Sequence, residues 1–249
     1  MHIFEELDYQ KTPLGDISLR RRSEPKLNNQ ILYEVKLGEE FLMSSLFVEA
    51  EEQLSLLGLQ KLKENGHKQC VDIVVGGLGL GYTAVKALQD SAVSSLKVID
   101  VMQPVISWHQ KGLLPVGDVL ATDRRCQLIH DDFFAVATTL GGFSPEGLQP
   151  NSEGDSAKVH AVLLDIDHSP SHWLNEGNSG FYTQESLYKM SANIHSGGVF
   201  GLWSNELPDP KFAALLNQVF ANTESHIVNF SNPYSGGESI NSVYIATVA

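Results

Sequence analysis

Four glycines follow the apolar residues 73–75 and lead into a helical run that ends near residue 88. Because glycine has no Cβ, such a segment can turn sharply and let a ligand lie against its backbone. The helix that follows directs free N–H groups toward the same place. This pattern predicts a nucleotide or nucleoside site, unless the glycines serve only to pack the helix on the strand. The glycines are Gly76, Gly77, Gly79 and Gly81.

Two carboxylates end the next two apolar runs. Asp100 follows the first glycine, Gly76, at close to the spacing of about 20 residues at which a carboxylate meets the ribose hydroxyls of a nucleoside. Asp131 could accept a hydrogen bond from an adenine amine. Either acid alone is also typical of a solvated strand end, but together beside a glycine turn they predict one nucleoside site. A dinucleotide fingerprint fits only from Gly79 to Ala84, after the turn has begun at Gly76, so the register disfavours NAD.

Another apolar run, near residues 160–164, is followed by a group of polar residues, namely Asp165, Asp167 and His168. Asp165 could orient an attacking amine and accept its proton, so it is the first candidate for a catalytic base. The alternative is a carboxylate that caps the following turn. His168 is a second candidate base, although a surface histidine is the commoner case. Pro170 breaks the helix that would gather the nearby histidines on one face, so no metal site is predicted.

The elements that carry these residues alternate between strand-like and helix-like runs from residue 70 onward. This order predicts an α/β fold with a doubly wound, mostly parallel seven-stranded sheet, because right-handed crossovers need helices on both faces. The last two strands are joined only by a polar, glycine-rich segment, so the last strand should be antiparallel, as in class I methyltransferase-like folds. The expected strands cover residues 70–75, 95–100, 126–130, 160–167, 197–204, 225–231 and 242–249, and the expected helices cover residues 81–88, 104–111, 132–140, 183–194 and 210–220.

The chain is expected to form two units. Short β-like runs separated by turn residues predict a small N-terminal β element over residues 1–45. A helix over residues 46–66 then leads into the main unit, residues 46–249. Residues 141–158 are typical of a long surface loop, whose role stays open. The basic run at residues 20–22 is expected to be solvated and without chemistry.

The composition limits the partners of the protein. Its formal net charge of −13 repels nucleic-acid phosphates and favours a small, cationic acceptor. The sequence shows no leader and no apolar run of membrane-spanning length, so we expect a cytoplasmic protein without a membrane partner. Cys70 and Cys126 are too few for a disulfide scaffold and adjoin apolar runs, so both should be buried thiols. Whether the chain forms a homodimer stays open.

Over residues 32–200 the order of motifs resembles that of the polyamine aminopropyltransferases, spermidine synthase in particular. DIVVGGLGLGYT is similar to the glycine-rich turn of that family, VIDVMQPVI to its ribose-binding strand end, LIHDDFF to its adenine-binding segment and AVLLDIDHSP to its catalytic strand. The resemblance implies a Rossmann-like nucleoside fold with Asp100 on the ribose, Asp131 on the adenine and Asp165 at the reaction centre.

The chain departs from the family at places that decide the cofactor and the acceptor. Gly79 stands where the family has an aspartate that holds the aminopropyl ammonium of decarboxylated S-adenosylmethionine, so discrimination against intact S-adenosylmethionine is removed. Residues 50–52 match a Tyr-His-Glu motif that lines the polyamine site, and only the acid Glu52 is kept. The second aspartate of the catalytic stretch is shifted to Asp167 or replaced by His168.

These observations together predict an S-adenosylmethionine-dependent transferase of spermidine-synthase-like fold that moves a methyl group to a small, amine-bearing or cationic acceptor. Candidate residues for the acceptor are Glu52, Asp167 and Trp203, the last of which could equally belong to the core. The first alternative is an aminopropyltransferase that uses decarboxylated S-adenosylmethionine. The second is a noncatalytic, nucleoside-binding regulator.

Overall fold

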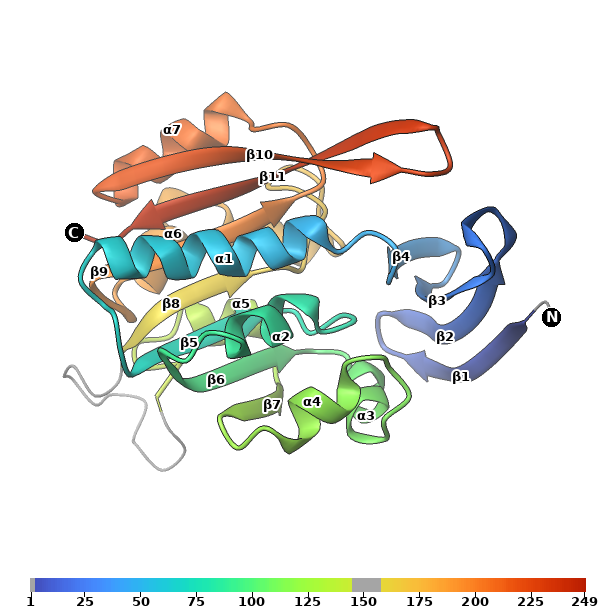
Figure 1. Cartoon of the computed structure of the whole chain (residues 1–249). Helices are drawn as coiled ribbons and strands as arrows, with labels where there is room; N and C mark the ends of the chain where they lie inside the picture. Colours follow the sequence, from blue (N-terminus) through green and yellow to red (C-terminus); the bar gives the residue numbers. More distant parts are fainter. Residues whose placement is uncertain (1–2, 145–157) are drawn as a thin grey trace.

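The computed structural model of the chain describes residues 3–144 and 158–249. Its main sheet has the strand order β10-β11-β9-β8-β5-β6-β7 (Figure 1). Strands β9, β8, β5, β6 and β7 are parallel, and β11 is antiparallel to both of its neighbours. The predicted seven-stranded, mostly parallel sheet with an antiparallel last strand is therefore confirmed. The strands are β5 (Val71–Gly76), β6 (Val93–Asp100), β7 (Cys126–His130), β8 (Val159–Leu164), β9 (Ile194–Ser204), β10 (Asn222–Asn232) and β11 (Gly237–Thr247).

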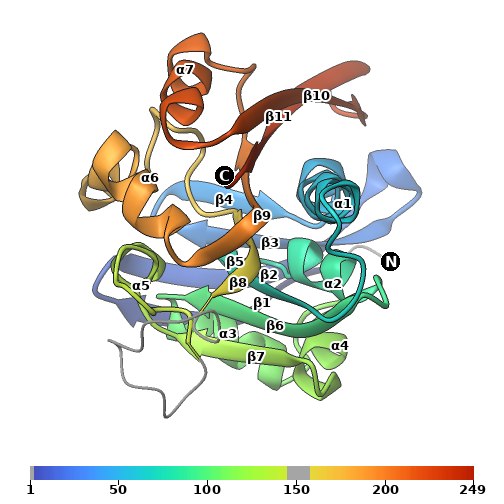
Figure 2. The same ribbon diagram turned by 90° about the vertical axis from the view of Figure 1, so that its left-hand side faces the viewer.

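Helices cover both faces of the main sheet (Figure 2). Helices α1 and α2 lie on one face, and α5, α6 and α7 on the other. Short helices α3 and α4 follow β6. The helices are α1 (Glu49–Glu64), α2 (Tyr82–Leu88), α3 (Gln103–Gln110), α4 (Gly117–Thr122), α5 (Phe133–Ala137), α6 (Gln184–Ser191) and α7 (Pro210–Val219), with short 3₁₀ turns at Pro25–Leu27 and Glu176–Phe181.

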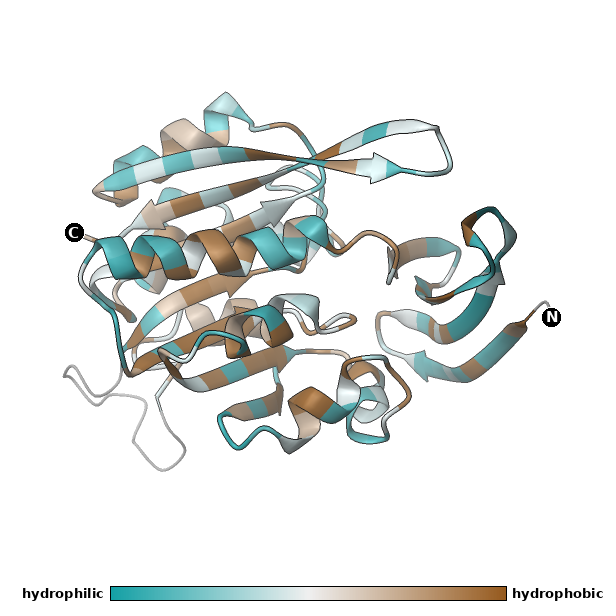
Figure 3. Ribbon diagram, viewed as in Figure 1, coloured by the Kyte–Doolittle hydropathy of each residue, from teal (hydrophilic) through white to brown (hydrophobic). Residues whose placement is uncertain are grey.

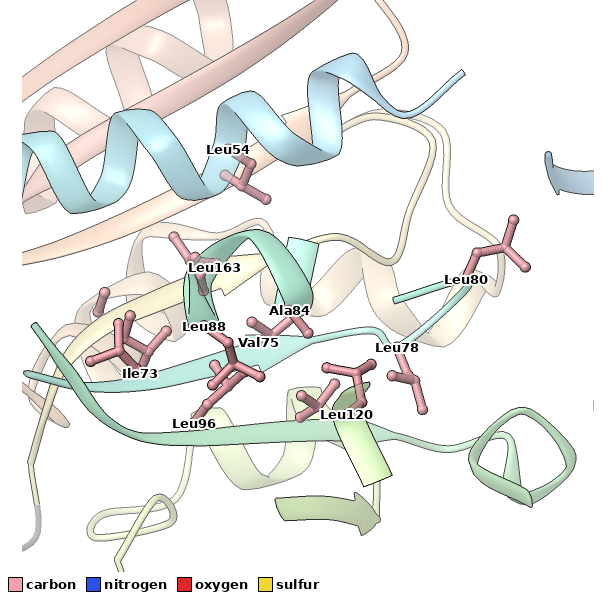
Figure 4. Packing of buried hydrophobic residues seen from close by; sticks show 14 of the residues in the cluster. Leu54, Ile73, Val75, Leu78, Leu80, Ala84, Leu88, Leu96, Leu120 and Leu163 are labelled. Atoms are coloured by element: carbon pink, nitrogen blue, oxygen red, sulfur yellow. The ribbon is translucent and has the colours of Figure 1, made fainter. Parts of the chain in front are cut away.

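The central strands are buried on both sides. Along β5, Ile73 and Val75 belong to the core under α1 and α2, whereas Val74 belongs to the core on the opposite face. Apolar residues therefore dominate the inner strands, while the helices are apolar on one side only (Figure 3). Figure 4 shows Leu54 of α1 facing Leu163 of β8, within the apolar layer that supports the end of β5.

A four-stranded antiparallel sheet precedes the main sheet and lies beyond the C-terminal ends of its central parallel strands (Figure 1). It consists of β1 (Phe4–Thr12), β2 (Gly15–Glu24), β3 (Gln30–Leu37) and β4 (Glu40–Ser44), paired in chain order. Ligands of open α/β sheets bind at that end of the strands. The small sheet therefore covers the edge where the sequence places its candidate site. The division into two units at residue 45 stays a prediction.

Polar contacts fasten the small sheet to the main unit. The Trp108 indole N–H of α3 donates to an Asp8 carboxylate oxygen of β1 over 2.6 Å. At the far side, the Tyr234 hydroxyl, in the turn between β10 and β11, donates to Glu24 and accepts from Arg22, each over 2.9 Å. The small sheet is thus held from both sides of the ligand-binding edge.

Some local expectations were wrong. Cys70 is exposed, because it lies in a turn with a φ of +53° just before β5, and Cys126 is only partly buried. Strand β1 and helix α4 were not predicted. The basic run is not simply solvated, since Arg20 and Arg22 both pair with Glu34, a residue only 2% exposed.

Most of the expected surface loop, residues 145–157, lies outside the described residues. Within the described part of the chain, no helix has the length and apolar character needed to cross a membrane.

Candidate functional site

The glycine turn after β5 needs glycine at particular positions. Gly77, Gly79 and Gly81 have φ values of +92°, +47° and +91°, which residues with a side chain rarely adopt. A Cβ on Gly77 would also lie 2.0 Å from the Asp165 backbone oxygen. The turn therefore brings the end of β5 against the end of β8, and Gly76 is the last residue of β5 itself.

Asp100 holds this turn from the neighbouring strand. One of its carboxylate oxygens accepts from the Leu78 N–H over 2.8 Å, and the other accepts from the Met102 N–H over 2.7 Å. Burial raises the pKa of Asp100, while these backbone hydrogen bonds oppose that rise. The carboxylate thus lies where the sequence expects a ribose, and it also anchors the loop that would receive the nucleoside.

Asp131 lies at the end of β7 and is exposed. Its carboxylate accepts from the Asp132 N–H over 2.8 Å, and its own N–H donates to the Asp100 carbonyl oxygen over 3.2 Å. The two strand-end acids are therefore neighbours across β6 and β7, as a single nucleoside site requires.

A cavity lies between the glycine turn, the last strand of the small sheet and the segment after β8. It brings together five of the residues singled out from the sequence, which are Gly79, Gly81, Asp165, His168 and Trp203. It also contains Met43 of β4 and Glu51 of α1. The other sequence-predicted residues do not line it, namely Gly76, Gly77, Asp100, Asp131, Glu52 and Asp167.

Asp165 and Glu51 form an acidic pair in this cavity. Burial raises the pKa of Asp165 to about 6, and a 2.7 Å hydrogen bond from the Thr83 hydroxyl opposes the rise. Burial, and then the negative charge of Asp165, raise the pKa of Glu51 to about 8. Near neutral pH the pair therefore holds about one proton, with Glu51 protonated and Asp165 largely ionised. This arrangement suits the binding of one cation.

The phase of helix α1 explains why Glu51 faces the cavity and Glu52 does not. Leu54, Ser55 and Gly58, which lie three, four and seven positions after Glu51, are all buried. Glu51 is on the same inward face. Glu52 lies beside it and pairs with Lys86 of α2 over 3.1 Å. The helical period of the buried residues is the signal that could have identified Glu51 from the sequence.

Asp167 fixes the segment that follows β8. It is 3% exposed and accepts three hydrogen bonds of 2.8 Å, from the Leu174 N–H, the Asn178 amide and the Tyr182 hydroxyl. Burial raises its pKa, and these donors oppose the rise. With its oxygens used in this way, Asp167 orders the wall of the cavity rather than facing an acceptor within it.

His168 and Trp203 lie in the wall of the cavity. The His168 imidazole is 2.8 Å from Glu40 of β4, so it joins the segment after β8 to the small sheet. The Trp203 indole N–H is buried and has no hydrogen-bond partner among the described residues. Trp203 is therefore a donor beside the cavity without an acceptor in the part of the chain that the structure describes.

No family model matches the sequence, and no curated protein matches it. Solved structures do resemble it. A spermidine synthase in complex with the transition-state analogue AdoDATO has a TM-score of 0.70 and 16% identity, over 98% of this chain and 74% of its own. Spermidine synthase from Thermotoga maritima has a TM-score of 0.67 and 14% identity, over 98% of this chain and 72% of its own.

The human methyltransferase-like protein 13 in complex with SAH has a TM-score of 0.53 and 14% identity, over 81% of each chain. At these identities the likeness concerns the fold alone. The chain thus has the fold shared by spermidine synthases and class I methyltransferases, which the motif order in the sequence predicts.

Proposed function

We propose that this chain is an S-adenosylmethionine-dependent transferase that methylates a small, amine-bearing acceptor, with Asp165 as the catalytic base. One observation carries the proposal: a partly buried carboxylate with a pKa of about 6 lines the same cavity as the glycine turn. At neutral pH such a group can orient an amine and accept its proton. The fold supports a transferase of this class.

The residues around the turn fit an adenosyl cofactor. At Gly77 and Gly81 an added Cβ would collide with the protein itself, so these glycines let the turn pack closely. Gly79 lines the cavity, and a Cβ there would meet only the end of the Met43 side chain, at 3.0 Å. Asp100 supplies a carboxylate for the ribose hydroxyls, and Asp131 an acceptor for the adenine amine. The cofactor supplies a methyl group already activated by a sulfonium.

Asp165 then acts on the acceptor. Asp165 would accept one proton of the acceptor amine as its nitrogen takes the methyl group from the cofactor, whose sulfur would keep the electron pair of the carbon–sulfur bond. The Thr83 hydroxyl holds one oxygen of the carboxylate in place, and Ser55 in turn donates to the Thr83 carbonyl over 2.6 Å. Because the sulfonium is a good leaving group, alignment and deprotonation of the amine are what the protein must provide.

A second candidate is aminopropyl transfer from decarboxylated S-adenosylmethionine. The observation that favours it is the position of Glu51. Its carboxyl group lines the same cavity as Gly79, which itself has no carboxylate to offer. When ionised, Glu51 would attract an aminopropyl ammonium and repel the α-carboxylate of the intact cofactor. Near neutral pH its raised pKa keeps it largely protonated, which leaves methyl transfer as the first choice.

A mass-spectrometric screen of amines with both cofactors tests the proposal. Methyl transfer adds a methyl mass to the acceptor, and aminopropyl transfer adds an aminopropyl mass. We expect methylation of a cationic amine that weakens as salt rises, because the protein is strongly acidic. Calorimetry gives a second readout: tighter binding of the decarboxylated cofactor would overturn the choice of methyl transfer. Nucleoside binding without any turnover would support the regulator instead.

Replacement of Asp100 by alanine is expected to weaken cofactor binding by about 1.5–3 kcal/mol, the scale of lost charge-assisted hydrogen bonds. The change removes both the expected ribose acceptor and the anchor of the Leu78 N–H. Calorimetric titration with S-adenosylhomocysteine measures it. Asp131→Ala is the matched comparison, and its effect should be below about 1 kcal/mol because Asp131 is exposed. An unchanged affinity in Asp100→Ala would place the ribose elsewhere.

The raised pKa values predict how stability depends on pH. The folded state binds more protons than the unfolded state between the ordinary carboxyl range and pH 8, so the free energy of unfolding should fall as pH rises through this window. Glu51→Gln removes most of this dependence. At pH 8.5 it should raise the melting temperature above that of the wild type by a few degrees, since each kcal/mol of unfolding free energy corresponds to about 2–4 °C.

Melting curves from pH 5 to 9 check this expectation. Glu52→Gln is the control on the adjacent residue, because Glu52 pairs with Lys86 outside the cavity. Equal pH slopes for the wild type and Glu51→Gln would contradict the proton sharing in the cavity.

A further inference from the structure

The glycine turn contains one peptide that can face either of two ways. Residues Leu78 to Gly81 form a β-turn closed by a 2.8 Å hydrogen bond from the Gly81 N–H to the Leu78 carbonyl. Its first central residue, Gly79, has a φ of +47°, and the second, Leu80, does not have a positive φ. These signs are those of a type II′ turn. Turn types I′ and II′ differ mainly in the orientation of the peptide between the two central residues, which is here the Gly79–Leu80 peptide.

His109 of α3 lies beneath this peptide. The residue is fully buried, and its Nε2 atom is 2.9 Å from the Gly79 carbonyl oxygen. Its other ring nitrogen, Nδ1, is buried without a hydrogen-bond partner among the described residues. Burial lowers the pKa of His109, so the ring is neutral and carries one proton. That proton belongs on Nε2, because the alternative tautomer would set a lone pair against the carbonyl and bury an unpaired donor.

The contact with His109 decides where the next N–H points. A trans peptide directs its carbonyl and its N–H to opposite sides. With the Gly79 carbonyl turned toward His109 in the interior, the Leu80 N–H points to the other side of the loop. Leu80 lines the cavity there, whereas His109 does not. Among the described residues, no acceptor pairs with the Leu80 N–H.

We propose that His109 is a positioning residue that holds the Gly79–Leu80 peptide so that the Leu80 N–H binds the α-carboxylate of the cofactor. This rests on the proposed function and deepens it. Glu51, on another wall of the same cavity, is placed to bind the α-ammonium, so the cavity offers partners to both ends of an amino-acid zwitterion. A decarboxylated cofactor would leave the Leu80 N–H unpaired, which disfavours it. His109 thereby contributes to cofactor choice without touching the cofactor.

Two variants and two ligands test this role. His109→Leu keeps an apolar filling but removes the donor, and His109→Gln places an amide N–H near the position of Nε2. S-Adenosylhomocysteine carries the amino-acid group, whereas 5′-methylthioadenosine lacks it. In calorimetry, His109→Leu should lose about tenfold in affinity for S-adenosylhomocysteine and less than about twofold for 5′-methylthioadenosine. His109→Gln should recover to within about threefold of the wild type.

The second ligand separates positioning from folding. If His109→Leu merely loosened the fold, both ligands would lose affinity alike, and the proposed role would be overturned. Unchanged affinity for both ligands would overturn it as well. Failure of the proposed function looks different, because the wild-type protein would then bind neither ligand, or would bind 5′-methylthioadenosine at least as tightly as S-adenosylhomocysteine. Melting temperatures of both variants, measured with and without S-adenosylhomocysteine, give a readout that does not depend on turnover.

Discussion

Asp165→Asn is expected to lower kcat by about 10²–10³-fold, the usual contribution of a general base, while cofactor affinity stays within about threefold. Asparagine has nearly the same shape and can still accept the hydrogen bond from Thr83. It cannot take a proton from the acceptor amine. Single-turnover mass spectrometry gives the rate, and calorimetry gives the affinity. In the wild type, the rate should rise as pH passes through about 6, where Asp165 loses its proton.

Asp72→Asn is a suitable control for this change. Asp72 lies at the opposite end of the main sheet, near the start of β5, where its carboxylate accepts from the Ser94 hydroxyl over 2.9 Å. Its replacement should leave both rate and affinity unchanged. A fully active Asp165→Asn protein would remove Asp165 from the catalytic step and favour another base such as His168.

The second large effect concerns the fold under the site. Gly77→Ala is expected to lower the free energy of unfolding by more than about 3 kcal/mol, which corresponds to roughly 6–12 °C in melting temperature. A Cβ at this position would lie 2.0 Å from the Asp165 backbone oxygen, and both groups are part of packed strand ends. Neither can move without disturbing the contact between β5 and β8.

Gly66→Ala separates crowding from backbone conformation. Gly66 has a φ of +100°, close to the +92° of Gly77, but a Cβ there would meet nothing within 4 Å. The loss at Gly66 should therefore be limited to the conformational cost, about 1–2 kcal/mol. Equal losses in thermal denaturation of the two variants would mean that the turn can relax around an added methyl group.

The main sheet could be predicted because the burial of each strand and the turn after it depend on residues that are neighbours in the sequence. Strands such as β5 are buried on both faces, which gives continuous apolar runs, and glycine marks the turn that follows. Strand β1 carries no such signal, since most of its side chains are at least partly exposed. Helix α4 has only six residues, too few for a helical period to appear. Cys70 looked like part of a strand, but the backbone turns just before β5.

The sequence predicts a site residue most directly where that residue stands at the end of a strand. Asp100 and Asp165 stand at strand ends, and the order of strands brings those ends to one edge. Which of the two adjacent glutamates faces the cavity follows from the helical period of α1, because the buried residues of that helix lie on the side of Glu51. His109 lies in a helix of ordinary composition, and its contact with Gly79 arises only when α3 packs under the turn. Such contacts belong to the tertiary structure and have no signature in a short stretch of sequence.

The place of β11 affects how the protein can be assembled during synthesis. It follows β9 and β10 in the chain but lies between them in the sheet. As the chain leaves the ribosome, one edge of β9 and the whole of β10 lack their partner until residues 237–247 have emerged. Open strand edges can pair with other chains and so promote aggregation. Insertion of β11 is therefore the non-local step that ends this exposure, and residues 237–247 must have been translated before the main sheet can close.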